Sequence, residues 1–122
     1  MAWQFNQTEP VFLQIAQVLR ARIVSGELAP GSLAPTVRQL AADAAVNPNT
    51  VQRALTLLEE EGLLRAQSTA GRLITGDEEI LRQAREALIR DVAARLVREA
   101  HALGLGAKEL LAYIEKEEER YE

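Results

Sequence analysis

The 122-residue chain has the composition of a globular protein, with 48% hydrophobic and 26% charged residues. It contains no cysteine, which excludes disulfides and thiolate metal sites, and no apolar run long enough for a membrane helix. The N-terminal segment lacks the basic and apolar regions of a secretion signal. We therefore expect a cytoplasmic protein without membrane association.

The formal net charge of −4 is unusual for a protein that binds nucleic acid, but it is unevenly distributed. Residues 1–75 contain six basic and six acidic side chains, whereas residues 76–122 contain eight basic and twelve acidic ones. All six basic side chains of the first part are arginines. Contacts to phosphate there would therefore depend on a few arginines, hydroxyl groups and backbone amides.

The first predicted helix covers residues 10–25. Its apolar residues recur at spacings of three and four, which places them on one face of the helix. These residues are Phe12, Ile15, Leu19 and Ile23. Pro10 suits the first helical turn, and Gly26 ends the helix. Before this helix, Trp3 and Phe5 alternate as in a short extended arm, and we expect them to pack on a hydrophobic surface.

A short second helix and a third helix follow, separated by a break at residues 44–47. Thr36 and Gln39 have the spacing of a capping box at the start of the second helix. Asn47 is a good N-cap for the third helix, and Pro48 fits its first position. The residues predicted for the buried face of the third helix are Val51, Ala54, Leu55 and Leu58.

Two short extended segments, 63–67 and 72–75, predict a β-hairpin after the third helix. Asp77 then caps a long helix over about 78–103, and a last helix covers about 107–119. The apolar stripes of these helices are too wide for one helical hairpin to bury, so we expect a homodimer interface. The residues predicted for this interface are Leu81, Leu88, Val92, Leu96, Leu103, Leu110, Leu111 and Ile114.

Three helices followed by a hairpin are the parts of a winged helix-turn-helix, a mostly α fold with a small β-wing. Its third helix enters the major groove of DNA, and its second helix lies across the backbone. The segment 47–53 suits this role, because Asn and Gln can pair with adenine, Arg with guanine, and Thr with phosphate or thymine. The expected organisation is a winged helix over 1–76, with the helix-turn-helix over about 36–58 and the wing over about 63–75. A two-helix dimerisation unit over 77–122 completes it.

Five linked segments resemble the GntR family of bacterial transcription regulators over about residues 9–75. These segments are 10–15, 23–31, 35–41, 46–54 and 58–64. The Val-Asn-Pro-Asn-Thr-Val sequence at 46–51 and the short tail look like the YtrA-type subgroup, whose helical C-terminal region serves for dimerisation. The resemblance implies a sequence-specific DNA-binding transcription regulator, most often a repressor. It implies DNA contacts from Thr36, Arg38, Asn47, Asn49, Thr50, Gln52 and Arg53, and at the hairpin tip from Thr69, Gly71 and Arg72.

Two positions depart from the family pattern. Ala34 stands where the family usually has a leucine before the second helix, and Leu33 lies one place earlier. A shifted register of this loop is therefore one alternative. In the wing, the usual Gly-x-Gly has lost its first glycine, which is Thr69 here, and Arg72 follows the remaining Gly71.

The two-fold symmetry of a homodimer would match a palindromic operator with half-sites one helical turn apart. No enzyme is expected, because the sequence has no nucleophile–base pair, phosphate-binding glycine loop or recognisable carboxylate pair. His101 is the single histidine, so we expect neither a metal nor another cofactor. A small-molecule effector would have to bind a cleft at the dimer interface. The alternative function is a helical protein–protein interaction module without DNA binding, which would leave the Asn-Pro-Asn-Thr helix without a role.

Overall fold

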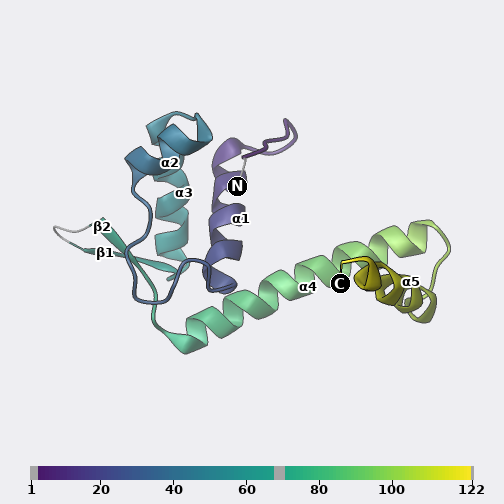
Figure 1. Ribbon diagram of the computed structural model, residues 1–122. Coiled ribbons are helices and arrows are strands. Elements are labelled where there is room, and N and C mark those ends of the chain that lie inside the picture. Colours follow the sequence, from purple (N-terminus) through teal and green to yellow (C-terminus); the bar gives the residue numbers. More distant parts are fainter. Residues whose placement is uncertain (1–2, 68–70, 122) are drawn as a thin grey trace. The chain divides into compact units, whose positions relative to one another are not determined.

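The computed structural model describes residues 3–67 and 71–121, which fold into five helices and a two-stranded antiparallel sheet. In chain order the elements are α1 (Val11–Val24), α2 (Val37–Ala44), α3 (Pro48–Glu60), β1 (Leu64–Gln67), β2 (Gly71–Ile74), α4 (Glu78–Ala102) and α5 (Ala107–Arg120) (Figure 1). The predicted fold class, mostly α with a small β-wing, is confirmed. The contacts divide the chain into two compact units, Met1–Arg85 and Glu86–Glu122.

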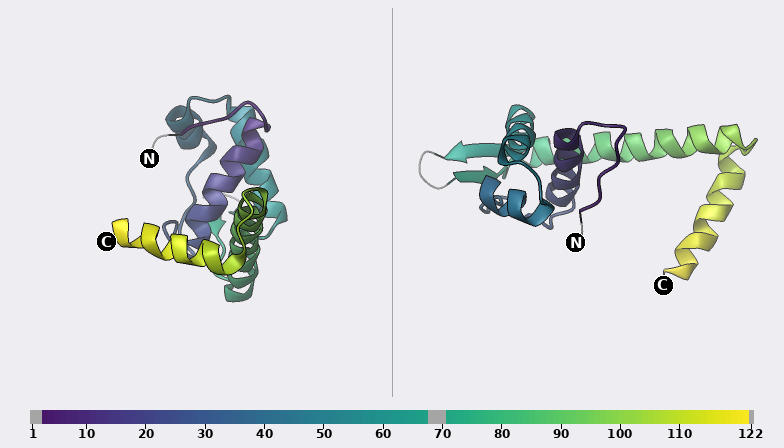
Figure 2. Two further views of the ribbon diagram at one scale, coloured as in Figure 1. Left: turned by 90° about the vertical axis from the view of Figure 1, so that its right-hand side faces the viewer. Right: turned by 90° about the horizontal axis from the view of Figure 1, so that it is seen from above.

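The first unit, Met1–Arg85, has one core between its helices and its sheet, and α1 and α3 lie side by side in it (Figures 1 and 2). The largest fully buried side chains of this core are Ile15, Leu19, Ile23, Val51, Leu55, Leu58, Leu63 and Ile74. Ile80, Leu81 and Ala84 from the first turns of α4 pack against it. These contacts explain why the unit continues to Arg85. The division into functional domains after residue 76 stays a prediction.

The N-terminal arm packs on this unit, as the alternation of Trp3 and Phe5 predicts. The two aromatic rings stack with their centroids 5.9 Å apart. The indole Nε1 of Trp3 donates a hydrogen bond of 3.3 Å to a carboxylate oxygen of Asp43 in α2. The guanidinium of Arg22 in α1 lies 5.0 Å from the centre of the Trp3 ring. The arm therefore links α1 to α2.

A tight turn joins α2 to α3. Ala45 adopts the left-handed conformation in this turn, with φ 55° and ψ 47°. The amide of Val46 donates to the carbonyl of Ala41 at 3.1 Å, which closes the last turn of α2 in the manner of a Schellman motif. At the other end of α2, the predicted capping box between Thr36 and Gln39 is confirmed.

A third extended segment pairs with β2 and was not predicted. Within the sheet, β1 pairs with β2 in antiparallel register, and Leu33 forms an isolated antiparallel bridge with Leu73. The amide of Ala34 donates to the carbonyl of Arg72 at 2.8 Å. Ala34 is buried against the core, whereas Leu33 is 60% exposed. The leucine side chain therefore lies at the surface, and the shifted register of this loop stays one alternative.

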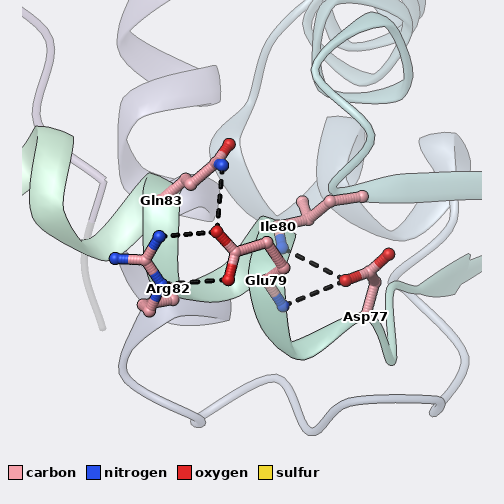
Figure 3. Close-up of polar contacts among 5 residues, drawn as sticks. All are labelled: Asp77, Glu79, Ile80, Arg82 and Gln83. Carbon is pink, nitrogen blue, oxygen red and sulfur yellow. Dashed lines mark hydrogen bonds and ion pairs between the residues drawn. The ribbon is translucent and has the colours of Figure 1, made fainter.

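The N-terminus of α4 is capped by Asp77, as predicted (Figure 3). One carboxylate oxygen of Asp77 accepts the amide hydrogens of Glu79 and Ile80 at 3.0 and 3.3 Å. The carboxylate of Glu79 in turn accepts hydrogen bonds from Arg82 and Gln83. The hydrogen bond from Arg82, followed by that from Gln83, lowers the pKa of Glu79 below its ordinary value.

The second unit, Glu86–Glu122, consists of the rest of α4 and α5, joined by a short corner (Figure 2). Gly104 has φ 79° there, and the amide of Leu105 donates to the carbonyl of Ala100 at 2.8 Å. This is again a Schellman-type end, at which glycine is favoured. Among the described residues of this unit, Ala100 alone is buried. The unit therefore has almost no hydrophobic core of its own.

Candidate nucleic-acid interface

Helix α3 is fixed to the first unit along one side and is exposed along the other. Its buried residues are the predicted ones, Val51, Ala54, Leu55 and Leu58. Because successive helical residues are about 100° apart, the side chains opposite these four share one exposed face. The exposed residues of this face are Asn49, Gln52, Arg53 and Thr56. The structure thus brings three of the predicted DNA contacts together on one surface.

The N-terminus of α3 is closed by Asn47. Its side-chain oxygen accepts the amide hydrogen of Asn49 at 2.8 Å, and Pro48 at the first position has no amide hydrogen to satisfy. The predicted role of Asn47 as N-cap is confirmed. The NH₂ group of the exposed Asn47 can still donate to DNA, and that contact stays a prediction.

Thr36 and Arg38 are exposed at the N-terminus of α2. The Thr36 hydroxyl oxygen accepts the amide hydrogen of Gln39 at 3.1 Å, and the Gln39 side chain accepts that of Thr36 at 2.9 Å. The hydroxyl hydrogen of Thr36 is not used in these bonds and can be donated to a phosphate oxygen. Arg38 forms no ion pair within residues 3–67 and 71–121, so its charge is available to DNA.

A shallow groove lies between the N-terminal turns of α1 and α3. Its lining residues are Pro10, Val11, Phe12, Asn49, Thr50 and Arg53. Thr50 is half-buried. The guanidinium carbon of Arg53 lies 3.8 Å from the centre of the Phe12 ring, a cation–π contact between the two helices. Three predicted contact residues, Asn49, Thr50 and Arg53, therefore line a concave surface together with α1.

The wing arginine is engaged within the chain. The Nε of Arg72 donates to a carboxylate oxygen of Glu59 in α3, and the Arg72 side chain is 17% exposed. Gly71 begins β2 with φ 82°, a conformation that glycine adopts readily. Thr69 lies outside the described residues. DNA contacts from the wing stay a prediction, for which Arg72 could use the guanidinium N–H groups other than the Nε–H that Glu59 accepts.

Ion pairs engage half of the six arginines in residues 1–75. Arg20 contacts Glu61 at 2.7 Å, Arg22 contacts Glu27 at 3.5 Å, and Arg72 contacts Glu59. Among the described residues up to position 75, the arginines outside ion pairs are Arg38, Arg53 and Arg65. All three are exposed. The cationic surface available to phosphate is correspondingly small.

Two residues of this surface were missed in the sequence. Thr56 lies one turn beyond Gln52, whose side-chain amide donates to its hydroxyl oxygen at 3.4 Å. The spacing of four residues on an exposed helix face could have indicated this pair. Phe12 was assigned only to the apolar face of its helix. Its contact with Arg53 joins residues 41 positions apart, and no local pattern indicates it.

The residues predicted for dimerisation differ in how much they are exposed. Leu81 packs against the core of the first unit, and Leu88 and Leu110 are half-buried. The other five are exposed, and the exposed fraction of each is 46% for Val92, 37% for Leu96, 79% for Leu103, 55% for Leu111 and 37% for Ile114. Ile89, Val97 and Tyr113 add further exposed apolar surface to the same unit. These side chains are available for contact with another molecule.

No group of three His, Asp or Glu residues in the described part of the chain could hold a metal ion. His101 is exposed in the last turn of α4. None of the helices described here is long and apolar enough to cross a membrane.

The chain is similar in sequence and in structure to bacterial transcription regulators. The gntR family of bacterial regulatory proteins matches residues 12–74. The HTH-type transcriptional regulator YhcF of Bacillus subtilis is 36% identical over 108 residues, covering 88% of this chain and 89% of the relative. The HTH-type transcriptional repressor YtrA of Bacillus subtilis is 30% identical, covering 91% and 86%. Among solved structures, a GntR family transcriptional regulator from Listeria monocytogenes aligns with a TM-score of 0.85 and 28% identity, covering 92% and 98%.

Proposed function

The chain belongs to the GntR family of bacterial regulatory proteins and is a DNA-binding transcriptional regulator, and we propose that it represses transcription by binding a palindromic operator as a homodimer. The observation that carries this proposal is the exposed face of α3, where Asn49 and Gln52 are presented by a helix whose opposite side is buried. Amide side chains of this kind make bidentate hydrogen bonds to adenine in the major groove.

The contacts to DNA are assigned by position. Asn49 and Gln52, near the N-terminus of α3, read base edges, as in other helix-turn-helix proteins. Thr36 and Arg38, at the N-terminus of α2, contact the phosphate backbone and set the register of α3 in the groove. Asn47, the N-cap of α3, and Thr50, in its first turn, contribute further hydrogen bonds. This division separates residues that select a sequence from residues that provide affinity for any sequence.

The proposed homodimer forms through the second unit. Among the described residues of this unit, Ala100 alone is buried. The unit therefore lacks the core that a small domain needs. Val92, Leu96 and Ile114 remain exposed on its helices, and apolar burial between two copies would contribute about 25 cal/mol per Å². Two half-sites one turn apart on DNA would require α3 helices about 34 Å apart.

Repression is proposed because the relative YtrA, 30% identical over most of both chains, is named a repressor. A small-molecule effector, if one is needed, would act at the dimer interface. The alternative function, a helical interaction module without DNA binding, does not agree with membership of the GntR family.

Selection of duplexes from a random pool, followed by fluorescence anisotropy, tests the proposal. We expect a palindromic sequence to be enriched and to bind at least 1,000-fold more tightly than random DNA, as is common for specific binders. Gln52→Ala should lose about 1–3 kcal/mol on this duplex. Gln17→Ala, at an exposed glutamine of α1, is the matched control and should bind normally. Selection without enrichment, together with a monomer in sedimentation at micromolar concentration, would contradict the proposal.

A further inference from the structure

Arg53 is held against α1 more closely than a flexible surface arginine would be. Its guanidinium carbon lies 3.8 Å from the centre of the Phe12 ring, compared with 5.0 Å for Arg22 over Trp3. A separation of this size corresponds to van der Waals contact between the planar cation and the ring face. Phe12 is itself half-buried and packs against the core, so the ring is a fixed support.

The position of Arg53 on α3 differs from that of Gln52, which does not line the groove between α1 and α3. With about 100° between successive residues, Gln52 and Arg53 lie on opposite sides of Asn49. Arg53 is on the side that faces α1, where it lines the groove with Pro10, Val11, Phe12, Asn49 and Thr50. An α-helix with its side chains is about 10–12 Å wide and the major groove about 12 Å. A side chain on the flank of the helix therefore comes close to the groove wall, which is formed by the phosphates.

We propose that Phe12 is a positioning residue that holds the Arg53 guanidinium for a backbone phosphate of DNA, so that Arg53 contributes affinity and not base selection. This inference rests on the proposed function and changes the role that the sequence motif implied for Arg53. Stacking occupies one face of the guanidinium and leaves its in-plane N–H groups available. Those N–H groups match two phosphate oxygens, and the planar cation suits both contacts at once.

The energetic effect of Phe12 is to order Arg53 before DNA arrives. A free arginine loses the mobility of its side chain on binding, and this loss weakens binding about two- to tenfold for one side chain. Stacking on a ring that the core already fixes removes part of this loss. The effect acts on every DNA sequence equally, because a phosphate is present at every position.

Four variants test the inference, each measured by anisotropy on the selected duplex and on a scrambled duplex over a range of salt concentrations. Phe12→Leu should bind both duplexes about two- to tenfold more weakly with an unchanged ratio between them. Phe12→Tyr should behave as the unchanged protein. Arg53→Ala should reduce the slope of log affinity against log salt by about 0.9 per subunit, again without changing the ratio. Arg53→Lys keeps the charge but not the planar stack, so it should keep the slope and lose affinity.

Two comparisons exclude a purely structural role for Phe12. Phe12→Leu combined with Arg53→Ala should bind no more weakly than Arg53→Ala alone, because Phe12 acts only through Arg53. Phe5→Leu, at another ring packed on the same unit, should leave DNA binding unchanged. The inference is overturned if Phe12→Leu weakens binding further in the Arg53→Ala background, or if Arg53→Ala changes the ratio between the two duplexes. Failure of the unaltered protein to bind any duplex would instead overturn the proposed function.

Discussion

Replacing Ala45 with glycine should stabilise the first unit. Ala45 is exposed and has φ 55° and ψ 47° in the turn between α2 and α3. A left-handed conformation costs an L-amino acid about 1–2 kcal/mol, and glycine avoids this cost. Glycine also gains freedom in the unfolded chain, which reduces the benefit by about 0.4–1 kcal/mol. The net stabilisation should be about 0.5–1 kcal/mol, because an exposed methyl group contributes no packing that would be lost.

Thermal unfolding followed by circular dichroism measures this difference. For a unit of this size, 1 kcal/mol shifts the midpoint by about 4–8 °C, so Ala45→Gly should raise it by about 2–8 °C. All samples need equal protein concentration, because the proposed dimerisation would make the midpoint depend on concentration. The matched control is Ala42→Gly, an exposed alanine inside α2, which should lower the stability by about 1 kcal/mol. If both variants lower the midpoint, the left-handed conformation does not determine the energy of this turn.

Three further predictions follow from the described contacts. Arg38→Ala should weaken binding to specific and random duplexes by the same factor and reduce the salt slope by about 1, as measured by anisotropy; a change in base preference would contradict a phosphate contact. Leu96→Glu should give a monomer in sedimentation that binds the operator poorly. The control Ala94→Glu, at a residue exposed on the other side of α4, should remain dimeric. A dimeric Leu96→Glu variant would place the interface elsewhere. The lowered pKa of Glu79 means that its carboxylate stabilises the folded chain at neutral pH and loses this effect as the pH falls below the ordinary glutamate value of 4.5 and through the lowered pKa. Glu79→Gln should therefore show a smaller drop in unfolding midpoint on acidification than the unaltered protein, and an equal drop would contradict the assignment.

Features that depend on neighbouring residues could be predicted from the sequence. The capping box of Thr36 and Gln39 and the N-cap of Asn47 each involve residues two or three positions apart. The helix ranges follow from the spacing of the apolar residues, because the residues that face one common core recur every three or four positions. For the same reason, the exposed face of α3 was predictable once Val51 and Leu58 were assigned to the core.

Features that depend on distant residues could not be predicted in this way. The bridge between Leu33 and Leu73 joins segments 40 positions apart, and no alternation at Leu33 indicates a strand. The partner of Arg72 lies 13 positions away, across the junction of helix and hairpin. The motif at Arg53 suggested a base contact, and its orientation toward α1 depends on Phe12, 41 positions earlier. In each case the sequence contains suitable residues, but only tertiary packing decides which of several partners they meet.

The N-terminal arm provides an optical signal for following this protein without a label. Trp3 is the only tryptophan in the chain, and its indole is stacked on Phe5, bonded to Asp43 of α2 and approached by Arg22 of α1. Indole emission responds to polarity and to nearby charges, so separation of α1 from α2 would change its wavelength or intensity. Trp3 lines neither the α1–α3 groove nor the exposed face of α3. Its fluorescence therefore reports the integrity of the helix-turn-helix independently of contacts made by α3, and distinguishes variants that have lost DNA affinity from variants that have lost their fold.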